Sequence, residues 1–193
     1  MNALDRLSAD IRACRICEAH LQPRPVFRVS RGARLLIAGQ APGTRVHDSG
    51  VPFTDPSGDR LREWLGMDAD VFYDAARVAI VPMGFCFPGL DAMGGDKPPR
   101  PECARTWRSA LLEQLPALRF RVLIGAYAQR WHLGDRVKAT VTETVAAWAG
   151  YLPGAIPLPH PSWRNNAWLK KNPWFERETL PALRAGVALA LSD

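Results

Sequence analysis

The four cysteines of the sequence are spaced as one candidate set of metal ligands. Cys14 and Cys17 form a C-x-x-C pair, 68 residues separate that pair from Cys86, and 16 more precede Cys103. Four thiolates can bind either zinc or an iron–sulfur cluster. Zinc sites made of four cysteines usually consist of two close pairs, and only one pair is close here. The spacing therefore disfavours zinc, while a cluster, zinc and no metal all stay open.

A second group of residues with chemical potential lies where a short apolar run ends. The run Leu35–Ala38 leads directly into Gly39-Gln40-Ala41-Pro42-Gly43. This loop has neither the glycine pattern of a dinucleotide site, nor the Gly-Lys-Ser/Thr of a P-loop, nor the serine of a nucleophile elbow. It offers backbone N–H groups and the amide of Gln40, which forms hydrogen bonds but cannot act as a general base. The alternative is a plain turn after a strand.

A histidine follows the last apolar run in a rigid frame. His160 lies between Pro159 and Pro161, and the polar segment Ser162-Trp163-Arg164-Asn165-Asn166 comes after it. A single histidine is often only structural. The two prolines and the position at the end of a predicted strand favour a functional role here.

The elements that must position these residues follow an alternating pattern. Helical patterns begin near Pro56, Pro101 and Pro173, and Pro181 is expected to kink the last helix or delay its start. Short apolar runs predict four strands, at 34–39, 77–83, 119–124 and 155–158. Alternating strands and helices predict an α/β fold, a three-layer α/β/α sandwich around a four-stranded parallel sheet. Ligands of such sheets bind beyond the carboxyl ends of the strands, so the long Gly/Pro loop 84–101 is expected to be functional.

The composition indicates one domain over residues 1–193 and a polyanionic partner. The chain has 47% hydrophobic residues and a formal net charge of +6. Residues 1–34 hold seven arginines against three acids, and residues 160–184 hold five basic residues against two acids. Nucleic acid is the commonest partner of such a surface, although a solvated basic surface is the alternative. We expect a cytoplasmic protein, because no signal peptide and no apolar run of membrane-spanning length is visible.

Together, the two loops resemble those of the uracil-DNA glycosylase superfamily. In that family the first strand ends in a G-[QE]-x-P-[YG] loop and the fourth in an H-P-[SA] loop, which Gly39–Gly43 and His160–Ser162 match. Val51-Pro52-Phe53 with Ser57-Gly58 resembles the family's P-F-x-G stretch. The cysteine spacing resembles the iron–sulfur branch, family 4, and implies a 4Fe-4S cluster on the four cysteines in preference to zinc. The resemblance covers roughly residues 14–166.

The resemblance implies a catalytic pair and a base pocket. His160 would donate a hydrogen bond to the departing uracil, and Gln40 would orient the attacking water. Family 4 has Glu where this chain has Gln40, so Gln40→Glu is expected to stay active. Its uracil-reading Asn corresponds here to Pro82, which leaves base reading to backbone groups near Met83 and Gly84. The other residues expected around the substrate are Gly39, Ala41, Pro42, Gly43, His47, Phe53, Asp55 and Ser162.

The segment after His160 is expected to contact DNA. By resemblance, Arg164 would act as a wedge in the base stack, with Trp163 as a stacking partner and Asn165 beside them; a plain phosphate contact is the alternative for Arg164. The predicted function is a monomeric, monofunctional DNA glycosylase that flips and excises uracil or another deaminated base. The rival is a non-catalytic DNA-binding protein of the same fold, because the Glu and Asn of family 4 are missing.

Overall fold

One parallel sheet forms the centre of the protein, as the sequence predicts. The computed structural model describes residues 2–192, and its sheet has the strand order β2-β1-β3-β4 with every pair parallel. The strands lie within the four predicted runs: β4 has the predicted bounds, and the other three are shorter than predicted. The strands are β1 Leu35–Ala38, β2 Val78–Ile80, β3 Phe120–Ile124 and β4 Ala155–Leu158.

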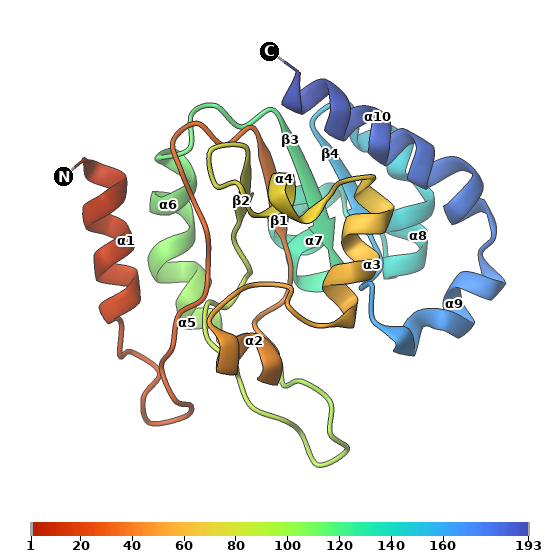
Figure 1. Ribbon diagram of the computed structural model, residues 1–193. Helices are drawn as coiled ribbons and strands as arrows, with labels where there is room; N and C mark the ends of the chain where they lie inside the picture. Colours follow the sequence, from red (N-terminus) through yellow and green to blue (C-terminus); the bar gives the residue numbers. More distant parts are fainter. Residues whose placement is uncertain (1, 193) are drawn as a thin grey trace.

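Helices cover both faces of the sheet, so the three-layer α/β/α arrangement is confirmed (Figure 1). The helices and short helical turns, in chain order, are α1 Ala3–Ala13, α2 Thr44–Ser49, α3 Pro56–Leu65, α4 Ala69–Tyr73, α5 Pro101–Cys103, η1 Ala104–Arg108, α6 Ser109–Glu113, α7 Gly125–Leu133, η2 Gly134–Arg136, α8 Val141–Ala146, η3 Trp148–Tyr151, η4 Trp163–Asn165, α9 Asn166–Lys171, η5 Phe175–Thr179 and α10 Leu180–Leu191. Within residues 2–192, no helix combines the length and apolar character that crossing a membrane requires.

The strands are apolar throughout because both of their faces are buried. Leu35 and Ile37 of β1 point to the side packed by α3, α4, α8, η5 and α10. Leu36 points to the opposite side, against α1 and α6. Ala38 also points to that side, where α7 packs. Alternate residues of one short strand thus join separate cores, which explains why the sequence shows no polar alternation.

Prolines set the helix boundaries near the places that the sequence predicts. α3 begins at Pro56, and the Asp55 carboxylate caps it by accepting a hydrogen bond from the N–H of Gly58 at 3.3 Å. Pro101 opens the continuous helical segment α5–η1–α6. Pro181 lies in the first turn of α10, preceded by the wider π-helical turn of η5. Pro181 has no N–H with which a regular α-helix could continue from η5. The regular helix α10 therefore starts late, which is one of the two outcomes expected from the sequence.

The loops at the carboxyl ends of β1 and β2 are joined by backbone hydrogen bonds. The N–H of Met83 donates to the carbonyl of Gly39 at 2.8 Å, and that of Gly84 donates to the carbonyl of Gln40 at 2.9 Å. The parallel pairing of the two strands therefore continues into the loops that follow them. This edge of the sheet lies toward the bottom of Figure 1, whereas the start of α1 lies at the upper left and the end of α10 at the top.

Candidate active site and thiol pocket

A pocket opens at this carboxyl edge and brings together most of the predicted site residues. The predicted residues that line it are Gly39, Gln40, Ala41, Pro42, Gly43, Phe53, Asp55 and His160. Asp96 and Pro82 line it as well. Residues more than 100 positions apart in the sequence therefore meet in one pocket, at the place where parallel α/β folds bind ligands.

The backbone fixes the tautomer of His160. The N–H of Ser162 donates to Nδ1 of His160 at 3.2 Å, so Nδ1 is an acceptor and the proton of the neutral ring is on Nε2. Although part of the residue is exposed, burial of the ring lowers the pKa of His160 below 6.5, against the opposing influence of Asp55 and Asp96. At neutral pH the side chain is therefore an uncharged Nε2–H donor at the pocket.

Two side chains hold the histidine loop in place. Asn165 donates its amide to the carbonyl of His160 at 2.7 Å. From α3, Arg60 donates to the carbonyl of Ser162 at 3.2 Å and to the Asn166 side chain at 2.8 Å. Asn165, predicted to contact DNA, thus has a hydrogen bond inside its own loop, and Ser162 contributes through its backbone.

Phe53 is held against the pocket in a backbone conformation that non-glycine residues rarely adopt. Its φ is 56°, and the hydroxyl of Tyr73 and the guanidinium of Arg62 donate to its carbonyl at 3.0 Å and 3.3 Å. Gly58 permits this arrangement, because a Cβ there would lie 1.9 Å from the carbonyl oxygen of Phe53. Strained backbone held by several contacts is typical of functional sites. The fixed aromatic ring offers a flat apolar wall.

Gln40 contacts the chain on the opposite side of the pocket. Its amide Nε2 donates to the backbone carbonyl of Lys97 at 3.2 Å. A carboxylate in this position would face the carbonyl as a second acceptor, so the amide suits this contact and the Glu of family 4 does not.

Other predicted substrate residues lie outside this pocket lining. The side chain of His47 points toward Gln22, with 3.3 Å between its Nε2 and the Gln22 Oε1. The N–H groups of Met83 and Gly84 are already donated to the carbonyls of Gly39 and Gln40, so they connect loops and are not free to read a base.

Asp96 is the functional candidate that sequence reasoning missed. It comes from residues 89–97, which fold into a hairpin with a bridge between Leu90 and Asp96 and a hydrogen bond from the Lys97 N–H to the Gly89 carbonyl at 2.9 Å. The hairpin is the yellow-green loop at the bottom of Figure 1. The carboxylate lies over the Gly39–Gly43 loop, since a Cβ at Gly43 would be 3.6 Å from its Oδ2. The available signal was loop 84–101 itself, whose fold-back the sequence did not reveal.

The predicted DNA residues lie beside the hairpin. Trp163 is 70% exposed, and the guanidinium of Arg164 lies 5.9 Å from its ring centroid. Arg164 also donates to the carbonyl of Gly94 at the hairpin tip, at 3.1 Å. Next to Gly94, Met93 is 95% exposed. Large side chains therefore project from two neighbouring loops next to the pocket.

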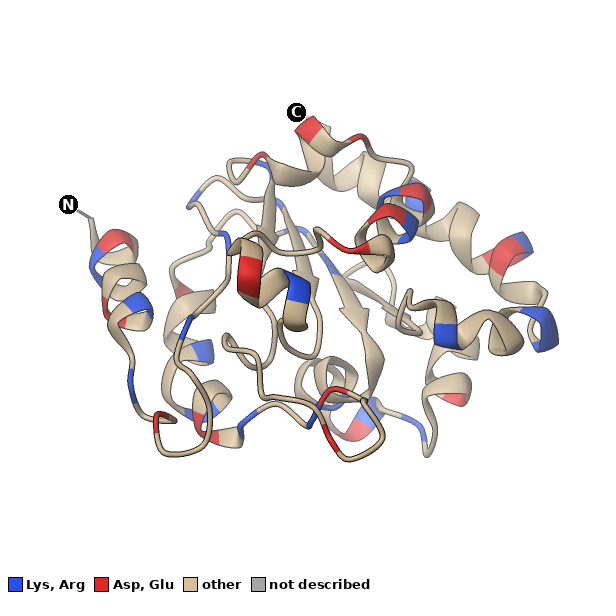
Figure 2. Cartoon of the chain, turned by 60° about the horizontal axis from the view of Figure 1, so that its bottom comes forward, with Lys and Arg blue, Asp and Glu red and all other residues tan. Residues whose placement is uncertain are grey.

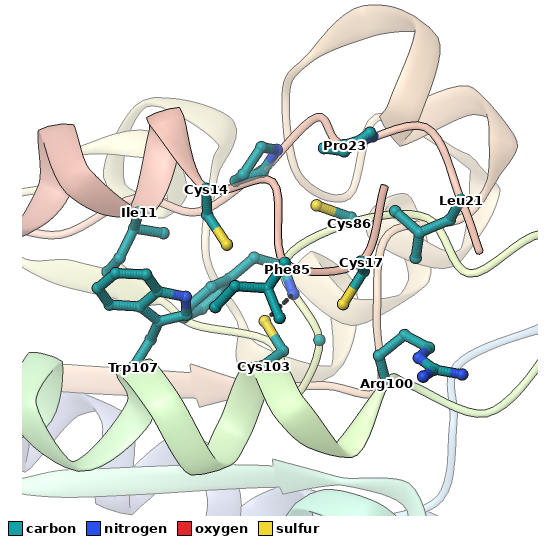
Figure 3. Close-up of a pocket in the computed structure, with 13 residues that line it drawn as sticks. Ile11, Cys14, Cys17, Leu21, Pro23, Phe85, Cys86, Arg100, Cys103 and Trp107 are labelled. Atoms are coloured by element: carbon teal, nitrogen blue, oxygen red, sulfur yellow. Dashed lines mark hydrogen bonds between the residues drawn. The ribbon is translucent and has the colours of Figure 1, made fainter. Parts of the chain in front are cut away.

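The four cysteines lie around a second pocket, between the N-terminal segment and the helix that begins at Pro101 (Figure 3). The backbone N–H of Phe85 donates to Sγ of Cys103 at 3.2 Å, the backbone of Arg24 donates to Cys86, and the side chain of Arg100 donates to Cys17. Burial raises the pKa of the Cys86 thiol to about 11 and that of Cys103 to about 12. Among residues 2–192, no three Cys, His, Asp or Glu side chains converge as ligands of a single ion do.

One buried donor faces this thiol pocket without a partner. Trp107 lines it, and its indole Nε1 has no hydrogen-bond acceptor among the described residues. In Figure 3 that nitrogen is on the side of the ring toward the thiols. Buried donors normally have an acceptor, so this N–H is available to an acceptor bound in the pocket.

Comparison with known families agrees with this architecture. The model of the uracil DNA glycosylase superfamily matches residues 27–184, which include β1, β4 and both loops that meet at the pocket. The match covers well over half of the chain. The chain therefore belongs to the uracil DNA glycosylase superfamily.

Proposed function

We propose that the protein is a monofunctional DNA glycosylase that flips uracil, or another deaminated base, out of DNA and hydrolyses its N-glycosidic bond. The observation that carries the proposal is the neutral Nε2–H of His160, which is fixed by the N–H of Ser162 and shares one pocket with the ring of Phe53. Superfamily membership supports the reaction class.

The pocket residues suit the separate steps of this reaction. The flipped base stacks on Phe53, which also shields it from water. As the bond between C1′ and uracil N1 breaks, the electron pair leaves with the base, and His160 donates a hydrogen bond to the developing negative charge at O2. An uncharged imidazole can fill this role, because its N–H stabilises the anion through a hydrogen bond and does not have to transfer its proton. Water then forms the new bond to C1′.

The surface around the pocket suits DNA. The chain has 25 basic and 19 acidic residues, and Figure 2, which brings the bottom of Figure 1 forward, shows basic segments on several of its loops. Arg164, Trp163 and Met93 project beside the pocket, where a duplex would have to open around a flipped nucleotide. Phosphate contacts by the basic residues would make binding weaken steeply with salt.

The test is excision from a uracil-containing oligonucleotide, detected as alkali-labile abasic sites. We expect the native protein to excise uracil. We expect His160→Ala to excise it at a rate lower by a factor of about 10²–10³, with DNA affinity nearly unchanged. His20→Ala is the matched control, since His20 is exposed and is not one of the residues that line the pocket. DNA binding without excision of uracil, hypoxanthine or xanthine would instead establish the non-catalytic rival.

We also propose that the four cysteines hold a 4Fe-4S cluster. The residues fit such a group. All four thiols line one pocket, N–H groups donate to three of them, and Trp107 offers a further donor. A cluster binds each thiolate through a different iron atom, so it does not require the convergence on one point that zinc does. When bound, it would supply a structural cross-link between the N-terminal segment and the helix that begins at Pro101.

The cluster proposal is tested on protein purified without oxygen. We expect brown protein that contains iron and acid-labile sulfide, with broad absorbance near roughly 400 nm. Colourless protein carrying stoichiometric zinc would refute it.

A further inference from the structure

Hydrolysis needs a group that orients the water, and a group that accepts the water's proton speeds the reaction; the loop after β1 provides no such proton acceptor. Gln40 occupies the place of the Glu in family 4, and an amide cannot accept a proton near neutral pH. Its Nε2 donates to the Lys97 carbonyl, and its Oε1 can accept a hydrogen bond from water but cannot take the proton. If the protein is a glycosylase, as proposed above, a proton acceptor must come from another residue of the pocket.

Two carboxylates line the pocket, and they differ in what they already do. Asp55 caps α3, with Oδ1 accepting from the N–H of Gly58. Asp96 is solvent-exposed, lines the pocket, lies over Gly43 and accepts no hydrogen bond that the structure gives for residues 2–192. Both of its carboxylate oxygens are therefore free to bind a water molecule at the pocket.

The structure holds Asp96 at this position from both sides of the hairpin. Gln40 anchors the hairpin strand that carries Asp96 through the neighbouring carbonyl of Lys97. Arg164 anchors the tip through the carbonyl of Gly94. The turn is closed by the Asp91 carboxylate, which accepts from the N–H groups of Met93 and Gly95 at 2.9 Å and 2.8 Å. The same contacts tie the hairpin to both loops of the proposed catalytic pair.

We propose that Asp96 is the catalytic carboxylate of this protein, and that Gln40 is a positioning residue that holds the Asp96 hairpin over the pocket. In the reaction, the bond from C1′ to the base breaks and its electron pair leaves on the base. The water oxygen bonds to C1′ while one water proton passes to the Asp96 carboxylate. Asp96 then releases that proton to solvent, and the departed base anion takes up a proton from solvent.

The charges around Asp96 agree with this role. Burial raises the pKa of Asp96 above the ordinary value of 3.8, while His160 and Arg164 lower it and Asp55 and Asp91 raise it. A carboxylate with a raised pKa is a stronger base than one with an ordinary pKa. Its negative charge also lies near the pocket in which the sugar becomes cationic.

The test is Asp96→Asn with Asp135→Asn as the matched control. Both variants remove one negative charge from an exposed Asp, and Asp135 lies in η2, outside the hairpin and the pocket lining. Rates are measured in single turnover with enzyme in excess over uracil-containing oligonucleotide, at concentrations that saturate binding. We expect Asp96→Asn to be slower by about 10² or more and Asp135→Asn to stay within about threefold of the native protein.

The outcomes separate this proposal from the one on which it rests. If the native protein excises no base, the proposed glycosylase function fails. If it excises uracil and Asp96→Asn is as fast as Asp135→Asn, the function stands and Asp96 is not the catalytic carboxylate. Asp55→Asn, made in parallel, identifies the other carboxylate in that case. Circular dichroism and the melting temperature of each variant distinguish a lost proton acceptor from a lost fold.

Discussion

Replacing Gln40 by Glu tests how the pocket is built, because the two residues have nearly the same shape but differ in charge and in their capacity to donate. The resemblance to family 4 predicts that Gln40→Glu stays active, since it recreates that family's loop. The structure leads to the opposite expectation. The amide donates to the Lys97 carbonyl at 3.2 Å, and a carboxylate would present an acceptor to that carbonyl and a third carboxylate to the pocket of Asp55 and Asp96.

The size of the effect follows from these contacts. A hydrogen bond of this kind contributes about 0.5–1.5 kcal/mol, and leaving the carbonyl and a carboxylate facing each other adds a cost of about 1 kcal/mol or more. The total is about 1.5–3 kcal/mol. It corresponds to roughly a 10- to 150-fold decrease in the fraction of molecules whose hairpin lies over the pocket, and so in the excision rate. Gln40→Ala loses only the hydrogen bond, so we expect a smaller loss of roughly 2- to 10-fold.

Two measurements check this reasoning. Single-turnover excision of uracil gives the rate, and hydrogen exchange of the 89–97 amides reports whether the hairpin is released. We expect Gln40→Glu to be slower than Gln40→Ala, with faster exchange in the hairpin in both. Excision by Gln40→Glu at the native rate, with exchange unchanged, would show that the Lys97 contact does not position the pocket.

Three further changes test other parts of the structure. Gly58→Ala should lower the free energy of unfolding by about 2 kcal/mol or more, measured by denaturant titration, because its Cβ would lie 1.9 Å from the Phe53 carbonyl oxygen; an unchanged midpoint would contradict this geometry. Arg164→Ala should slow excision from duplex DNA roughly tenfold more than from single strands, because only a duplex has a stack to open; equal losses would make Arg164 a phosphate contact. Cys103→Ser should reduce bound iron and the melting temperature together, and unaltered iron content would remove Cys103 from the proposed ligands.

The sequence predicts well those features that depend on local patterns. Each strand is a short apolar run, and the start of α3 follows from Asp55 and Pro56, which are adjacent in the chain. The convergence of Gln40 and His160 was also predictable, because the carboxyl ends of parallel strands share one edge of the sheet. Every one of these predictions needs only a few neighbouring residues and a general rule of topology.

The features that the sequence missed depend on how loops fold back. Asp96 reaches the pocket only because the hairpin turns at Gly94 and crosses the loop after β1, and no local pattern sets that path. Likewise, the sequence did not show that the N–H groups of Met83 and Gly84 are donated to neighbouring carbonyls, which leaves only their own carbonyls to read a base. Such contacts are long-range, and their partners can be identified only when the chain is folded.

The placement of the chain ends has a practical consequence for how the protein can be handled. The start of α1 lies at the upper left of Figure 1 and the end of α10 at its top, while the hairpin, one of whose residues lines the pocket, lies at the bottom. A tag or a surface linker attached at either end should therefore leave the pocket facing the solution. Immobilised protein should capture long DNA as readily as short oligonucleotides, so the scaffold suits single-molecule observation of sliding and pausing on stretched duplexes.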